Sequence, residues 1–129
     1  MKRKRTETFT ISYPDSKAER KRWMKEYSLN AIYAGKHWRA RRRDSEFWHW
    51  LVRVTMQRQG IPKKEFDRPV KINFYWHDGL DIDNHAYMGK LIVDAMKGYL
   101  LRDDSQRYYQ SVYNDPHDED CILVVVKEV

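Results

Sequence analysis

The stretch from Val70 to Gly98 constrains the fold of this chain most, because the spacing of its apolar residues changes once along it. In residues 70–76, apolar side chains alternate with Lys, Asn and Tyr, which is the two-residue period of a half-buried strand. From Asp83 to about Lys97 the apolar residues recur every three or four positions, which predicts an amphipathic helix closed by Gly98. The fold therefore needs a sheet packed against at least one helix.

The remaining segments extend this mixture of strands and helices. Their patterns predict a strand at 6–13, a helix at 17–27 capped by Ser16, a helix at 44–58, and strands at 108–113 and 121–126. Residues 28–35 are predicted as a loop with some helical turn, ended by Gly35. The unbroken apolar run of residues 121–126 is typical of a strand that is buried on both faces.

The predicted order of elements is strand, helix, helix, strand, helix, strand, strand. This order indicates a single α+β domain over residues 1–129, with a mixed β-sheet covered by helices. Because chain ends fray and this one is strongly basic, we expect residues 1–6 to form a flexible arm.

Charge is distributed unevenly along the chain, which has 129 residues and a formal net charge of +6. Residues 1–43 carry 14 Lys or Arg against 4 Asp or Glu, whereas residues 44–129 carry 11 against 15. This asymmetry favours nucleic acid or another charged surface as the partner; a merely soluble basic domain is the simpler alternative. The single cysteine, Cys121, cannot pair within the chain, and no apolar run reaches the length of a membrane span. We therefore expect a cytoplasmic protein without a membrane partner.

The acidic residues of the second half gather around the predicted helix. Asp81 and Asp83 precede or begin it two positions apart, so an extended backbone points both side chains the same way. Asp103 and Asp104 follow Gly98, where a hairpin-like return places one of them beside the first pair. Converging carboxylates repel one another unless a cation neutralises them, and Mg²⁺ or Mn²⁺ prefers such hard oxygen ligands.

Each of these residues also has an ordinary structural interpretation. Asp83 can cap the helix, where the helix dipole favours its ionised form. Lys90 and Asp94 are four positions apart on the polar side of the helix, as in any surface ion pair, and we interpret Asp94 as orienting Lys90. The ordered set, together with the basic first half, predicts a metal-dependent nuclease.

A cluster of cations and aromatic rings lies just upstream of residue 44. It comprises Lys36, Trp38, Arg39, Arg41, Arg42 and Arg43. Arginine binds phosphate and a tryptophan ring stacks on an unpaired base, so we interpret the cluster as DNA-binding. The alternative is a solvated helix start with Trp38 in the core. Farther along, Trp48 and Trp50 cannot both face the core, and Trp50 is interpreted as the surface residue.

The order of the acidic residues closely resembles that in the RusA-type Holliday-junction resolvases. The resemblance covers most of residues 30–129, and its motifs are Asp81-Ile82-Asp83-Asn84, Lys90, Val93-Asp94-Ala95-Met96, Gly98 and Asp103-Asp104-Ser105-Gln106, with Ser28-Leu29-Asn30 upstream. It implies a RusA-like fold in which the metal ligands are Asp81, Asp83 and Asp104 and the catalytic lysine is Lys90. Supporting positions are Asn30, Asn84, Asp94 and Asp103.

The same resemblance implies an activity and an assembly. Members of the family need Mg²⁺, with Mn²⁺ as a substitute, act as symmetric homodimers, and are common in phages and prophages. We therefore expect a crossover junction endonuclease that resolves four-way DNA junctions by paired nicks in recombination and repair. Residues 121–126 and Trp50 are candidate dimer contacts. The alternative is a non-catalytic accessory protein of phage recombination or replication that binds branched DNA.

Overall fold

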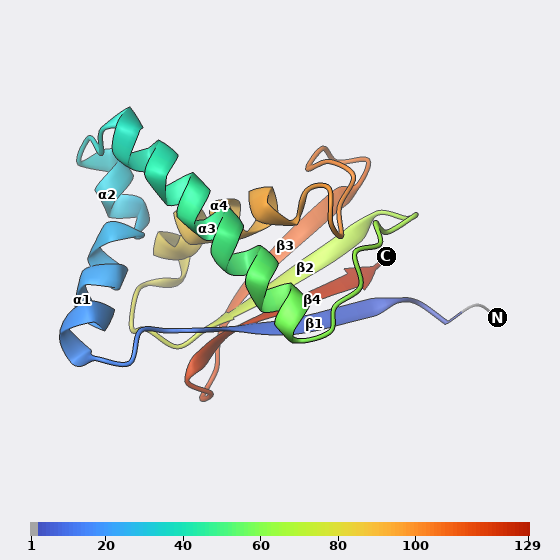
Figure 1. Ribbon diagram of the computed structural model, residues 1–129, viewed down its shortest axis with the longest axis horizontal. Helices are drawn as coiled ribbons and strands as arrows, with labels where there is room; N and C mark the ends of the chain where they lie inside the picture. The colour runs from blue at the N-terminus through green and yellow to red at the C-terminus, as the bar shows by residue number, and fades with distance from the viewer. Residues whose placement is uncertain (1–2) are drawn as a thin grey trace.

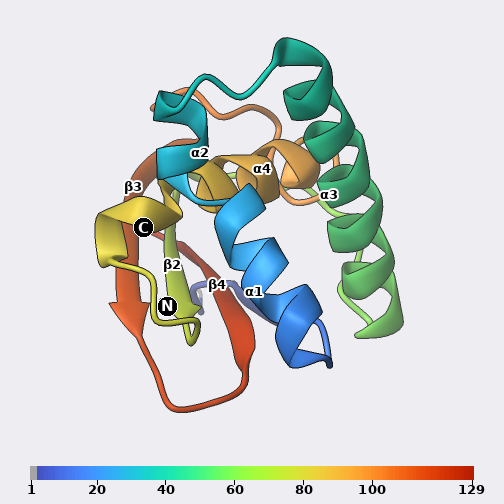
Figure 2. The same cartoon turned by 90° about the vertical axis from the view of Figure 1, so that its left-hand side faces the viewer.

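Four strands and four α-helices make up the computed structural model, which describes residues 3–129. The elements are β1 (Thr6–Ser12), α1 (Lys17–Glu26), α2 (Leu29–Tyr33), α3 (Trp38–Arg58), β2 (Val70–Trp76), a 3₁₀ turn η1 (Ile82–His85), α4 (Ala86–Met96), β3 (Tyr109–Pro116) and β4 (Cys121–Glu128). The strands form one mixed sheet in the order β1-β4-β2-β3, with β2 and β3 parallel and the other pairs antiparallel. The helices cover one face of this sheet (Figures 1 and 2). The predicted α+β class is confirmed.

Burial along the strands shows that only the helix-facing side of the sheet lies in the core. In β2 every second residue from Val70 to Trp76 is buried, as its period predicts. In β4 the buried residues are Ile122, Val124 and Val126, whereas Cys121 and the residues between them are only half-buried. The prediction that residues 121–126 are buried on both faces is therefore wrong, because no second layer of the described residues covers the other side.

Side-chain caps set where the helices begin. Ser16 accepts a hydrogen bond from the Glu19 N–H at 3.1 Å, which starts α1 as predicted. The helix predicted from residue 44 begins earlier, at Trp38, because His37 Nδ1 accepts from the Arg39 N–H at 3.1 Å. Among the described residues, no helix combines the length and the apolar character that a membrane crossing requires.

The helix predicted from Asp83 divides into a 3₁₀ turn and α4. The apolar stripe of α4 is buried as predicted, with exposures of 5% or less at Met88, Leu91, Ile92, Ala95 and Met96. However, η1 precedes the α-helix, and α4 begins without a side-chain cap. Asp83 is therefore not the cap of α4.

The two edges of the sheet differ. Along β1, the side-chain amide of Gln59 accepts from the Thr10 N–H at 2.9 Å and donates to the Thr10 carbonyl at 2.7 Å, as a neighbouring strand would. β3 forms the other edge, and no strand within residues 3–129 pairs with its outer side. Figure 2 shows β3 on the opposite side of the molecule from α3. The β3 edge is thus the one open to further strand pairing.

The start of the chain is more ordered than predicted. The first two residues of the expected arm at 1–6 lie outside the described residues. The Arg5 N–H donates to Glu128 Oε2 at 3.2 Å, and the Arg5 guanidinium lies 4.1 Å from the ring centroid of Phe66. Thr6 already belongs to β1. These contacts fix the chain from Arg5 onward.

Candidate functional site

Residues 81–84 form a turn beyond the end of β2, called the acidic turn from here on. The Asn84 N–H donates to the Asp81 carbonyl at 3.0 Å and closes the turn. The side chains of Asp81 and Asp83 are exposed, and no ion pair within residues 3–129 includes either of them. The fold therefore presents two uncompensated carboxylates close together on its surface.

A buried polar network supports the acidic turn. His85 Nε2 lies 2.7 Å from Asp78 Oδ1, and His85 Nδ1 lies 3.1 Å from the Ile82 carbonyl oxygen. The ring is 1% exposed and is held between these two oxygen atoms. The Tyr13 hydroxyl donates to Asp78 Oδ2 at 3.1 Å, and the Leu80 N–H donates to Oδ1 at 3.0 Å. Burial raises the pKa of Asp78, but His85 and these donors outweigh it and lower the pKa below its usual value.

A second charged group, called the charge cluster, lies at the other end of α4. Lys97 Nζ is 3.4 Å from Asp94 Oδ1 and 3.4 Å from Asp104 Oδ2, and Lys90 Nζ is 3.5 Å from Asp94 Oδ2. Burial raises the pKa of Asp104, but the charge and hydrogen bond of Lys97 outweigh it and lower the pKa. The predicted Lys90–Asp94 pair is thus present, and the acids of this group have cations beside them.

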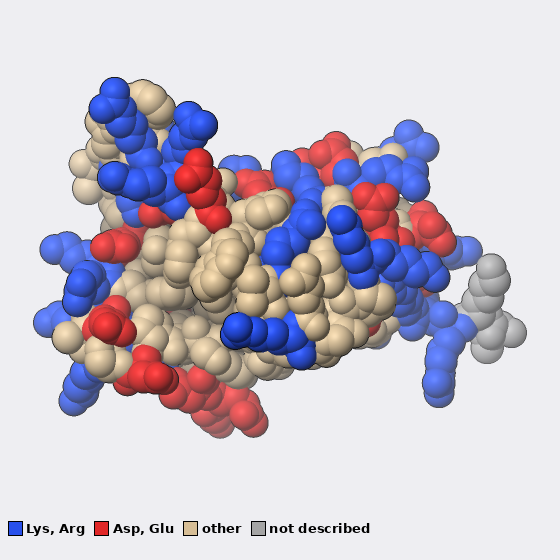
Figure 3. Space-filling view, viewed as in Figure 1, with Lys and Arg blue, Asp and Glu red and all other residues tan. Residues whose placement is uncertain are grey.

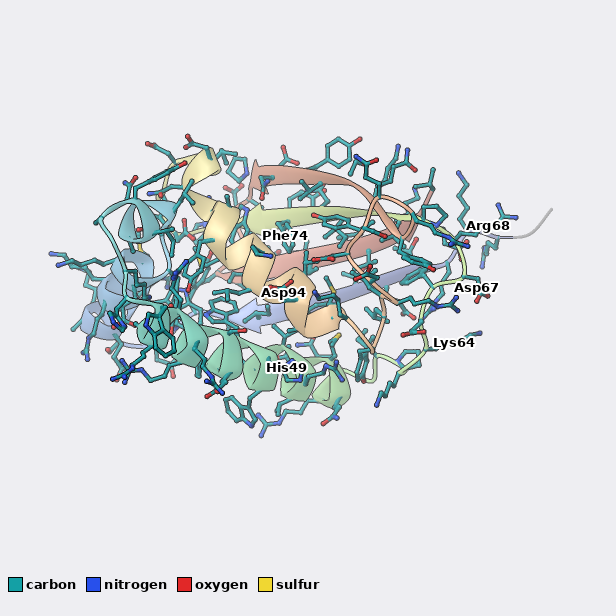
Figure 4. The ribbon with its side chains drawn as sticks, turned by 90° about the horizontal axis from the view of Figure 1, so that it is seen from above. His49, Lys64, Asp67, Arg68, Phe74 and Asp94 are labelled. Carbon is teal, nitrogen blue, oxygen red and sulfur yellow. The ribbon has the colours of Figure 1, made fainter. Side chains whose placement is uncertain are left out.

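A cavity of about 250 Å³ separates α4 from β3 beside the charge cluster. The cavity reaches the start of α4, and it is lined by Phe74, His85, Ala86, Gly89, Lys90, Val93, Asp94, Asp104, Tyr109, Val112 and Asn114. Figure 4 shows Asp94 on α4 and Phe74 on β2. Ligand pockets usually enclose roughly 300 Å³ or more. The cavity is below this range, and Lys90 in its lining keeps a side chain that is 69% exposed.

The acidic turn and Asp104 lie at opposite ends of α4. The turn leads into the helix, Asp104 is bound to Lys97 just after it, and an 11-residue helix is about 16 Å long. Leu100 and Leu101 are almost fully buried and anchor the returning chain at the far end. The expectation that Asp103 or Asp104 returns beside the acidic turn is therefore wrong within one chain. Among residues 3–129, no three His, Cys, Asp or Glu side chains are grouped to hold a metal ion.

The predicted DNA-binding cluster stands on a projection of the molecule. α2, the turn after it and the start of α3 extend beyond the sheet in Figure 1, and Figure 3 shows Lys and Arg crowding the same region. We call residues 33–43 the basic projection. The exposed members of the predicted cluster are Trp38, Arg39, Arg41, Arg42 and Arg43. Trp38 is 55% exposed, which excludes its alternative placement in the core.

Lys36 departs from the predicted DNA-binding set. Its side chain is only 14% exposed, and Nζ lies 2.5 Å from Asp44 Oδ2. Nζ also donates to the Glu26 carbonyl at 2.8 Å. The arginines are exposed, and Arg42 among them pairs with Glu46 at 3.5 Å on the surface, whereas Lys36 is used to attach the basic projection to α1 and α3.

Two hydrogen bonds join α2 and α3, the helices on either side of the turn in the basic projection, to the acidic turn and α4. The Asn30 N–H donates to Asn84 Oδ1 at 3.0 Å, so two predicted supporting residues meet although they are 54 positions apart. The Tyr87 hydroxyl donates to Asp44 Oδ2 at 2.6 Å. The projection is therefore held in a defined position relative to the two exposed carboxylates.

Several supporting residues escape prediction from sequence. Tyr87 and Lys97 fall on the polar side of α4 by helical spacing, and this signal could have identified them. Tyr13 and Asp78 are 65 positions apart and carry no local signal. In comparisons with known proteins, no family model and no curated protein sequence matches this chain. Its function is therefore proposed from the geometry of the site together with the motif resemblance.

Proposed function

We propose that this protein is a Mg²⁺-dependent endonuclease of the RusA type that cuts branched DNA, with four-way junctions as its substrate. The observation that carries the proposal is the exposed, uncompensated pair Asp81 and Asp83, joined through Asn84 to α2, which leads into the basic projection. DNA held on the projection brings phosphates near these carboxylates, which repel them unless a divalent cation is present. This combination suits a metal-dependent phosphodiester hydrolase that uses Mg²⁺ or Mn²⁺.

The three carboxylates implied by the family resemblance do not fit one metal ion within one chain. Asp81 and Asp83 supply hard oxygen donors of the kind that Mg²⁺ prefers. Asp104 is paired with Lys97 beyond the far end of α4. We therefore assign the third carboxylate to a second copy of the chain.

The open β3 edge offers a way to bring the two ends of α4 together. η1 contacts β3. The last residue of β3, Pro116, is level with the end of β2, and the first residue of β3, Tyr109, comes shortly after Asp104 in the chain. Antiparallel pairing of two copies of β3 about a two-fold axis sets the start of each strand beside the end of the other. Each acidic turn then approaches Asp104 of the partner subunit. In this arrangement the contact is β3 rather than residues 121–126 or Trp50, because β4 is an inner strand and Trp50 is on α3, on the opposite side of the molecule from β3.

Lys90 is the cation that we assign to the reacting phosphate. Asp94 lies 3.5 Å from its Nζ, while the Lys90 side chain stays 69% exposed. A positive charge held in place stabilises the negative charge that develops on the phosphoryl oxygens in the transition state. Two such sites in a two-fold dimer match the approximate two-fold symmetry of a four-way junction and account for paired nicks.

Mixing two inactive variants tests the shared site. Asp83→Asn and Asp104→Asn proteins should each fail to nick a synthetic four-way junction in Mg²⁺. After subunit exchange, a mixed dimer keeps one complete site if the carboxylates come from two chains, so about a quarter of the wild-type sites return. The measurement is nicking on a denaturing gel, with each variant alone as the control. A mixture that stays inactive although mixed dimers form would contradict the shared site.

The second candidate is an accessory protein that binds branched DNA without cutting it. The lack of a three-residue metal group within residues 3–129 of one chain favours this alternative. It predicts junction binding without nicks in Mg²⁺ or Mn²⁺ across four-way junctions, forks and flaps. Nicking by the wild-type protein that Asp83→Asn abolishes would exclude it.

A further inference from the structure

Two aromatic rings on the basic projection contribute little to the core. Tyr33 is 80% exposed and Trp38 is 55% exposed, whereas the tryptophans of the core are at most 9% exposed. Aromatic surface stabilises a fold mainly when it leaves water, so rings this exposed add little to folding stability. They flank the turn at Gly35 on the part of the chain that extends beyond the sheet (Figure 1). Their position is better explained by a binding partner.

The turn between the two rings is held in one conformation. The Ala34 N–H donates to the Asn30 carbonyl at 2.9 Å, and the Gly35 N–H donates to the Ile32 carbonyl at 3.0 Å. Gly35 has a φ of 93°, which a residue with a side chain rarely adopts. Lys36 then ties the turn to α1 and α3. A ring on a rigid turn loses little conformational entropy when a partner stacks on it.

Cations lie beside Trp38 and along the start of α3, and they select the charge of the partner. The Arg39 guanidinium carbon lies 5.3 Å from the Trp38 ring centroid, and the His37 ring stacks on Trp38 at 5.7 Å. The exposed arginines at 41–43 follow within the first two turns of α3, whose first turn has no acidic residue. Cations near a helix N-terminus oppose the helix dipole, and a bound polyanion compensates for them. Arginine beside an aromatic ring is a combination that binds nucleic-acid bases.

We propose that Tyr33 and Trp38 stack on unpaired bases at the branch point of DNA. This inference rests on the DNA binding in the proposed function and is independent of cleavage. In a linear duplex both faces of an internal base are covered by its neighbours. A base at a branch point can expose a face on which a protein ring stacks. The two rings therefore favour branched over linear DNA, and the link from Asn30 to Asn84 places that branch point near the acidic turn.

A fluorescent base at the branch point tests this proposal with the full-length protein. The probes are a four-way junction with 2-aminopurine at its centre and a linear duplex of the same length, both in EDTA so that no metal-dependent cleavage occurs. Trp38→Leu and Tyr33→Leu are each expected to raise Kd for the junction about tenfold and to weaken the 2-aminopurine response. Kd for the linear duplex should change less than about twofold, because the arginines that bind phosphate remain.

Trp50→Leu is the matched control. Trp50 is 57% exposed, close to the value for Trp38, and lies twelve residues farther along α3, about 18 Å along the helix axis. This variant should keep wild-type affinity for both DNAs and the wild-type fluorescence response. Circular dichroism of each variant verifies that the fold is retained.

Several outcomes would overturn the stacking proposal. These are equal losses of affinity on both DNAs, no loss with Trp38→Leu and Tyr33→Leu combined, no binding of the junction by the wild-type protein, and preferential binding of phosphatidylserine vesicles through the same two rings. A wild-type protein that stacks at the branch point but never nicks in Mg²⁺ refutes the nuclease and leaves the stacking intact. A double variant that nicks normally with an unchanged 2-aminopurine response refutes the stacking and leaves the nuclease intact.

Discussion

The acidic residues at the two ends of α4 differ in whether a cation lies beside them within the described residues. At the start of the helix, Asp81 and Asp83 are exposed and have no counter-charge within the described residues. At the other end, Asp94 and Asp104 share Lys97, which lowers the pKa of Asp104. A carboxylate beside a lysine is compensated within its own chain, whereas one without a counter-charge is compensated only by a cation from outside the chain. The availability of a carboxylate thus depends on its neighbours as well as on the motif that contains it.

The largest effect is expected at the uncompensated end of α4. Asp81→Asn or Asp83→Asn should remove detectable Mg²⁺-dependent cleavage, because each change removes a metal ligand. Junction binding should stay equal or become tighter, since one negative charge fewer repels the phosphates. Nicking and binding assays on the same junction measure both effects. The control is Asp118→Asn in the exposed loop after β3. Full activity in Asp81→Asn or Asp83→Asn would contradict the assignment of these residues as metal ligands.

Breaking the open edge of the sheet tests whether the two ends of α4 meet between copies. Val112 and Tyr113 on β3 are 47% and 48% exposed. Lysine at both positions brings like charges together across a two-fold strand pair and should convert a dimer into a monomer that no longer nicks. Light scattering at micromolar concentration gives the mass. The control is Thr8→Lys on β1, the edge of the sheet where Gln59 bonds to the Thr10 backbone. A wild-type protein that is monomeric and makes single unpaired nicks would favour a general nuclease.

The exposed lysine between the two ends of α4 should have a smaller effect on catalysis. Lys90→Ala is expected to slow cleavage by about 10²–10³-fold, the usual loss for one preorganised charge at a transition state. Affinity for the junction should change little, and single-turnover rates on bound DNA separate the two quantities. Lys71→Ala, on an exposed position of β2, is the control. A variant that binds weakly but cuts bound DNA at the normal rate would make Lys90 a phosphate-positioning residue.

The basic projection should act through salt-dependent binding rather than through the chemical step. Replacing the arginines at 41–43 with Ala should flatten the dependence of log K on log salt by up to about one unit for each lost phosphate contact. The control triple is Lys63, Lys64 and Arg68, which are exposed in the loop between α3 and β2, where Figure 4 labels Lys64 and Arg68. Binding titrations between low and moderate salt give both slopes. If the two triples behave alike, the projection is not the specific contact.

The smallest effect concerns the stability of the buried support beneath the acidic turn. The pKa of Asp78 is lowered in the folded protein, so its contribution to stability is present above the unfolded value of about 3.9. That contribution is lost as the pH falls through the folded pKa. Thermal unfolding measured in steps from pH 7 to pH 2 should therefore show Tm falling in this acidic window. Asp78→Asn should lower Tm at pH 7 and weaken the acid dependence, and an unchanged profile would refute the stabilising role of this carboxylate.

Local patterns were sufficient to predict most secondary structure. The period-two run of residues 70–76 became β2, and the apolar stripe after residue 86 became the buried side of α4. Ser16 capped α1 as predicted. These features depend on residues a few positions apart, so their physical causes are present in the local sequence. The sequence also marked the acidic turn and the exposed arginines as candidates, because their clustering is visible along the chain.

Contacts between distant residues decided the rest. Leu100 and Leu101 are buried and anchor the chain that leads to Asp104 at the far end of α4. Lys36, predicted as a DNA-binding residue, is mostly buried and pairs with Asp44. The bond between Tyr13 and Asp78 spans 65 positions, and no local pattern encodes it. The chain by itself therefore determined which elements form and which residue types are available. Only the tertiary structure decided which charges are paired and which remain free, because pairing depends on side chains that packing brings together from separate segments.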